Sequence, residues 1–105
     1  MIRRGDVWLV RLDPTVGSEL RKTRLCVVVS PDGLSHLPVH VIVPLTGRSA
    51  PSRFRPEIRF AGRVGRLLPD QMRSIDRSRM LRKIGELAPA DLTALLATLR
   101  EMFED

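Results

Sequence analysis

The 105-residue sequence has few residues of several types, and each shortage narrows the possible structures and functions. Its single cysteine, Cys26, excludes an internal disulfide and argues against a metal cluster, because zinc sites usually take about four Cys or His ligands. The apolar stretch in "DVWLV" is interrupted at Arg11 and is too short for a signal peptide. We therefore expect a cytoplasmic protein of one domain, residues 1–105, with no metal, no cofactor and no membrane segment.

Aromatic residues and lysine are also scarce. The chain has three phenylalanines, one tryptophan and no tyrosine, so arginine planes would have to supplement aromatic rings as platforms for nucleobases. Sixteen of the eighteen basic residues are arginine, whose planar guanidinium suits phosphate groups. Residues 1–85 carry seventeen bases and seven acids, whereas residues 86–105 carry five acids and one arginine. This distribution favours a polyanion as the partner, with a solvated basic surface as the alternative.

Hydrophobic periodicity predicts short strands followed by one helix. Alternating or continuous apolar patterns predict strands at residues 6–12, 25–30, 39–46, 57–60, 66–70 and 81–87, with turns at 31–38 and 61–65 and a polar stretch at 71–80. Pro69 would place its strand at a sheet edge or a bulge. Apolar residues spaced by three and four over 92–103 predict an amphipathic helix, and Pro89 and Asp91 suit its first turn. The predicted fold is mainly β with α: a small, strongly curled antiparallel β-barrel with a C-terminal α-helix.

The sequence contains no strong catalytic motif when its residues are considered without reference to any known family. The sequence contains no Gly-rich phosphate loop, and we expect His36 and His40 to have surface or packing roles. Arg24 begins the second predicted strand and Thr46 ends the third, so antiparallel pairing would bring the two residues close together. Each also borders a basic loop, at 13–24 and 47–56. Without further information, an exposed arginine and a threonine at a strand end are the simpler explanation.

Five motifs in order, "RGDVWLVRLDPTVGSE", "KTR" before "VVVSP", "VPLTGRS", "DQMRSIDRSRM" and "KIGEL", resemble the MazF/PemK family of bacterial toxins over nearly the whole chain. The resemblance implies an SH3-like barrel, similar to MazF and CcdB proteins. It also implies a homodimeric, metal-independent endoribonuclease that cuts single-stranded RNA at short sequences, with mRNA as the expected substrate and rRNA or tRNA as the alternatives. The implied partner is a cognate MazE-like antitoxin, and DNA would be contacted only through the antitoxin complex.

The resemblance also implies a set of site residues. The family's essential arginine and threonine fall on Arg24 and Thr46, and the glutamate of "GSE" falls on Glu19; these three are the expected catalytic residues. Two positions depart from the family pattern, because Leu25 replaces a usual proline and Pro69 a usual aliphatic residue. The expected RNA-binding residues are Ser18, Arg21, Lys22, Arg48, Ser49, Arg53, Phe54, Asp70 and Gln71.

Some members of the family use a different set, a histidine after the loop glycine and an arginine in a later strand. The corresponding positions here are Ser18 and Leu68, so that variant of the site is absent.

Cleavage of RNA without a metal requires the neighbouring 2′-hydroxyl to attack phosphorus, giving a 2′,3′-cyclic phosphate and a 5′-hydroxyl. We expect Arg24 to hold the phosphoryl oxygens through two hydrogen bonds and Thr46 to donate another. Arginine is a poor general base because its pKa exceeds about 12. Glu19 is a candidate for the base, but no spacing in the sequence identifies it. Two alternatives stay open: a CcdB-like toxin that poisons DNA gyrase without enzymatic activity, and a non-catalytic nucleic-acid-binding barrel.

Overall fold

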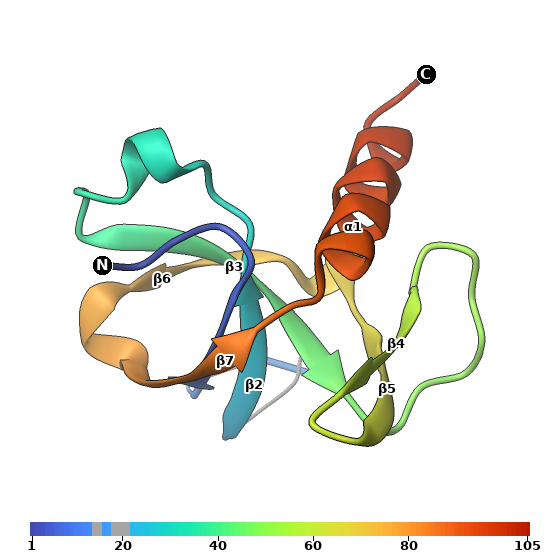
Figure 1. The fold of residues 1–105 in the computed structure, drawn as a ribbon, viewed down its shortest axis with the longest axis horizontal. Helices are drawn as coiled ribbons and strands as arrows, with labels where there is room; N and C mark the ends of the chain where they lie inside the picture. The colour runs from blue at the N-terminus through green and yellow to red at the C-terminus, as the bar shows by residue number, and fades with distance from the viewer. Residues whose placement is uncertain (14–15, 18–21) are drawn as a thin grey trace.

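The computed structural model describes residues 1–13, 16–17 and 22–105. This part of the chain forms one antiparallel sheet, a C-terminal helix and three short 3-10 helices (Figure 1). The strands are β1 (Asp6–Arg11), β2 (Thr23–Val28), β3 (Val39–Thr46), β4 (Glu57–Phe60), β5 (Arg63–Leu67), β6 (Arg73–Asp76) and β7 (Met80–Glu86). The helices are η1 (Asp32–Leu34), η2 (Pro69–Gln71), η3 (Arg77–Arg79) and α1 (Pro89–Met102).

Strand β3 is the centre of the sheet, whose strands follow the order β4-β5-β3-β2-β1-β7. One edge of β3 pairs with β2, whereas the other pairs with β6 over Val39–Ile42 and with β5 over Leu45–Thr46. Pro44 lies where β6 gives way to β5, and its carbonyl accepts a hydrogen bond from the Leu68 N–H at 2.9 Å. Because β3 pairs with both β6 and β5 along the same edge, the sheet curls into a half-barrel. The predicted curled antiparallel sheet with a C-terminal helix is thus confirmed.

Two hydrophobic clusters occupy the two faces of the sheet. Trp8, Val10, Cys26, Ile42 and Ile75 belong to the first cluster, on the face of the sheet opposite the second. The second cluster lies between the sheet and α1 and contains Val7, Val27, Val29, Val43, Ile58, Leu67, Leu87 and Leu95. Strand β2 contributes to both, with Cys26 and Val28 in the first cluster and Val27 in the second, so its second half is buried on both faces.

Helix α1, which follows β7 at the C-terminal end of the chain (Figure 1), packs its apolar stripe on the second cluster. Leu95 is fully buried there, and Leu92 and Leu99 are partly buried beside it. Pro89 lies in the first turn and Asp91 adds a negative charge near the helix N-terminus, as the sequence predicts. None of the helices in the described ranges is long and apolar enough to cross a membrane.

Three details of the β4–β6 region differ from the sequence prediction. The turn predicted at 61–65 needs only Ala61 and Gly62, which have φ values of 53° and 78°, because a two-residue hairpin turn places both central residues at positive φ. Strand β5 therefore starts at Arg63 and ends at Leu67, before Pro69, which lies in η2. The polar stretch 71–80 contains β6, which the pattern does not reveal because its one buried residue is Ile75.

Candidate active site

Arg24 and Thr46 lie on neighbouring strands at the same end of the sheet. The β2–β3 ladder ends at the pair Cys26 and Pro44, and continuing this register by two residues on each strand places Arg24 opposite Thr46. Residues that face one another across two strands direct their side chains to the same side of the sheet. Both residues also border one groove of about 530 Å³. The structure thus brings together the two residues that the sequence singles out.

Arg24 is exposed and extended. It pairs with Val10 of β1, so the ladder holds it in strand geometry although Leu25 replaces the proline usual in the family. Among the described residues its guanidinium has no hydrogen-bond or ion-pair partner. Burial raises the pKa of the nearby Cys26 thiol to about 12, and the positive charges of Arg73 and Arg24 partly oppose that rise. Both guanidinium groups therefore lie close enough to Cys26 to place positive charge beside it.

The Thr46 side chain is held by the turn that follows β3. Its hydroxyl oxygen accepts a hydrogen bond from the Arg48 N–H at 3.2 Å, and the hydroxyl lies 3.4 Å from the Arg48 carbonyl oxygen. Only 6% of the residue is exposed. Because a 3.4 Å hydrogen bond is long and weak, the hydroxyl proton can turn to an incoming phosphate oxygen at little cost.

Arg66 of β5 extends the same row of side chains. It pairs with Thr46 on one side and with Glu57 of β4 on the other. Its Nη1 donates to the Arg55 carbonyl at 2.8 Å, and its Nη2 lies 3.5 Å from Glu57 Oε1. Arg66 is not among the residues predicted from the sequence, because its place beside Thr46 depends on the register of β3 and β5, which in turn depends on the position of the Ala61–Gly62 turn.

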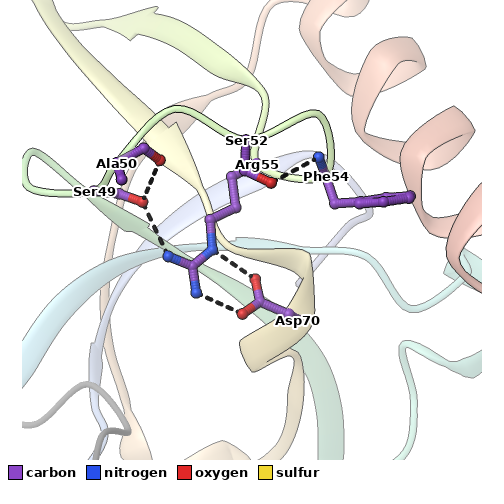
Figure 2. A network of polar contacts seen from close by, with 6 residues as sticks. All are labelled: Ser49, Ala50, Ser52, Phe54, Arg55 and Asp70. Atoms are coloured by element: carbon purple, nitrogen blue, oxygen red, sulfur yellow. Dashed lines mark hydrogen bonds and ion pairs between the residues drawn. The ribbon is translucent and has the colours of Figure 1, made fainter.

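The loop between β3 and β4 is held against η2 by Arg55 (Figure 2). The Arg55 guanidinium donates to both carboxylate oxygens of Asp70, from Nε at 3.0 Å and from Nη2 at 2.6 Å, and from Nη1 to Ser49 Oγ at 3.0 Å. The hydrogen bonds from Arg55 lower the pKa of Asp70. Ser49 and Asp70, both predicted RNA contacts, thus share a partner that the sequence does not single out.

The other predicted RNA-binding residues have varied surroundings. Arg53 forms an ion pair with Glu101 of α1, and its guanidinium lies 5.0 Å from the centre of the Phe54 ring. Lys22 and Arg48 are exposed, and Gln71 is half-buried in η2. Ser18, Glu19 and Arg21 lie outside the described residues. The roles assigned to all of these residues stay predictions.

Replacing Asp70 with asparagine is expected to loosen the loop 47–56 while changing the free energy of unfolding by less than about 1 kcal/mol, because ion pairs between partly exposed side chains contribute little. Hydrogen exchange of the loop amides would measure the loosening, with Asp76→Asn as the control that leaves it unchanged. Since folding lowers the pKa of Asp70, its contribution is complete above its ordinary pKa of about 3.9. The contribution is lost as pH falls through the lowered value. Unaltered loop exchange in Asp70→Asn would contradict this role.

Comparison with known proteins adds independent evidence. A family model described as PemK-like, MazF-like toxin of type II toxin-antitoxin system matches residues 3–103. Endoribonuclease MazF9 of Mycobacterium tuberculosis is 33% identical over 111 residues, covering 95% of this chain and 94% of that protein.

Two solved structures share the fold. MazF from Deinococcus radiodurans matches with a TM-score of 0.84 at 24% identity, covering 95% of this chain and 94% of that one. An endoribonuclease from a mycobacterial species, solved in complex with its cognate antitoxin, matches with a TM-score of 0.81 at 17% identity, covering 96% and 93%.

Proposed function

Because the chain belongs to the PemK-like, MazF-like toxins of type II toxin-antitoxin systems, we propose that it is a sequence-specific endoribonuclease that cuts single-stranded RNA without a metal ion. The observation that supports this most directly is the juxtaposition of Arg24 and Thr46 on one face of the sheet. Arg24 is exposed and has no ion-pair partner among the described residues, as a phosphate-binding cation should be.

The proposed reaction is an internal transfer at phosphorus. The 2′-oxygen attacks the adjacent phosphorus while its proton passes to a general base, the P–O5′ bond breaks, and the 5′-oxygen takes up a proton. Negative charge develops on the non-bridging oxygens, where two parallel N–H donors from Arg24 and the Thr46 hydroxyl would stabilise it. The general base is predicted to be Glu19, which lies outside the described residues.

We propose a cognate antitoxin as the protein partner, as in the mycobacterial complex whose fold this chain shares. The groove that Arg24 borders is also lined by Leu9, Leu25, Leu45 and Phe60, of which the last three pack against the second cluster. A segment with acidic and apolar side chains would fit this combination and would cover Arg24, which excludes RNA by competition. A homodimer in the cytoplasm, contacting DNA only through the antitoxin, completes the proposal.

The test is incubation of the purified protein with a mixed pool of single-stranded RNA in excess EDTA, followed by mapping of the new ends. Cleavage at a short recurring sequence, leaving 2′,3′-cyclic phosphate and 5′-hydroxyl ends, is the expected result. Intact RNA in the presence of correctly folded protein would count against the enzyme. Capture of DNA gyrase without RNA cleavage would favour the CcdB-like alternative, and salt-sensitive RNA binding without turnover would favour a binding barrel.

A further inference from the structure

Three residues on adjacent strands form a row across the end of the sheet. Arg24 on β2, Thr46 on β3 and Arg66 on β5 occupy successive positions, the first by the continued β2–β3 register and the last by a direct ladder pair. Neighbouring strands lie about 4.8 Å apart, and residues opposite one another share a face. The register therefore places an arginine at the strand position on each side of Thr46.

The Arg66 guanidinium is held in one orientation, but not all of its N–H donors have an acceptor among the described residues. Its side chain is 19% exposed, so its charge is less screened by solvent than that of a surface arginine. Nη1 is anchored on the Arg55 carbonyl at 2.8 Å, whereas the Glu57 carboxylate is 3.5 Å away and 59% exposed. A guanidinium has five N–H donors, so Arg66 retains donors for an anion.

The Arg55 main-chain carbonyl, which accepts the hydrogen bond from Arg66, belongs to a residue that is itself held in place. The Arg55 side chain is held by both oxygens of Asp70 and by Ser49 (Figure 2). A cation held in this way needs little reorganisation when charge develops next to it, which is the condition for electrostatic stabilisation of a transition state.

We propose that Arg66 is a further catalytic arginine, whose guanidinium binds a non-bridging oxygen of the scissile phosphate on the side of Thr46 opposite Arg24. This assignment rests on the proposed endoribonuclease function. Two cations and one hydroxyl then surround the phosphate, and both cations gain interaction energy as the phosphoryl oxygens become more negative during attack. The purely structural alternative is that Arg66 serves to neutralise Glu57.

Glutamine variants of the two residues separate these roles. If Arg66 only neutralises Glu57, Arg66→Gln and Glu57→Gln should change stability and cleavage to a similar extent. If Arg66 binds the phosphate, Arg66→Gln should lower kcat by about tenfold or more with little change in KM. Glu57→Gln should then keep full activity, because it removes a negative charge beside the cation.

The experiment measures kcat and KM in EDTA on an RNA oligonucleotide that carries a mapped cleavage site, with thermal melts to check folding. Arg82→Gln, which removes an exposed arginine on β7, is the matched control for net charge and should cut normally. Arg66→Lys keeps the charge and should recover part of the lost kcat, which provides a second variant if Arg66→Gln does not fold.

The outcomes distinguish this proposal from the one on which it rests. If the wild-type protein does not cut RNA, both proposals fall. If the wild-type protein cuts and Arg66→Gln retains its kcat, or loses activity through KM alone, the assignment of Arg66 is overturned while the endoribonuclease stands. Equal losses of kcat in Arg66→Gln and Glu57→Gln would likewise assign Arg66 to the ion pair.

Discussion

Arg24→Ala is expected to cut RNA about 10²- to 10³-fold more slowly than the wild-type protein, the loss usual when one fixed donor to a developing oxyanion is removed. The loss should appear in kcat, because the charge that Arg24 stabilises is greatest in the transition state. The melting temperature should stay unchanged, since the Arg24 side chain is exposed and has no partner among the described residues. Steady-state cleavage of a mapped oligonucleotide and a thermal melt measure the two quantities.

Two further variants sharpen this result. Arg24→Lys keeps the charge but loses the two parallel N–H groups, so it should recover only a small part of the activity. Arg100→Ala removes an exposed arginine from α1 and should cut at the wild-type rate. Wild-type kcat in a folded Arg24→Ala protein would refute the proposed mechanism, and a loss explained by a lower melting temperature would leave Arg24 with a structural role.

Much of the fold could be predicted from the sequence, because the most deeply buried elements have the most regular spacing of apolar residues. The third and fourth predicted strands coincide with β3 and β4, and the leucine spacing identifies α1. The pattern fails from Ala61 to Met80. There a two-residue turn with positive φ, a proline in a 3-10 helix and a strand with one buried residue leave little periodic signal.

The same limit applies to the site. Arg24 and Thr46 could be placed together because both lie at the ends of strands that are adjacent in sequence and antiparallel. Arg66 and Arg55 could not, because their neighbours are set by cross-strand register and by contacts between distant segments. Arg55 meets an acid fifteen positions away in η2, a contact that no local pattern encodes. The residues of a site can therefore be predictable from the sequence even when the interactions that hold them in place are not.

Gly65→Ala should damage both stability and activity, because Gly65 of β5 lies directly against the end of β3. A Cβ at this position would lie 3.0 Å from the Thr46 carbonyl oxygen and 3.1 Å from Leu45 Cδ1. The carbonyl is main chain and cannot swing away, so the end of β3 must shift. Overpacking of this kind costs about 1–3 kcal/mol, offset by about 0.5–1 kcal/mol from the lower backbone entropy of alanine. The melting temperature should fall by about 5–10 °C.

The shift caused by Gly65→Ala should reach the Thr46 hydroxyl, and a displacement near 1 Å at a reacting group can lower the rate by up to about 100-fold. Thermal melts and kcat measured on the same preparations test both effects. Gly33→Ala is the control, since its added Cβ meets nothing within 4 Å and no positive φ opposes it. If Gly65→Ala melts earlier but cuts at the wild-type rate well below its melting temperature, the position of Thr46 does not govern cleavage. The contribution assigned to its hydroxyl would then have to be withdrawn.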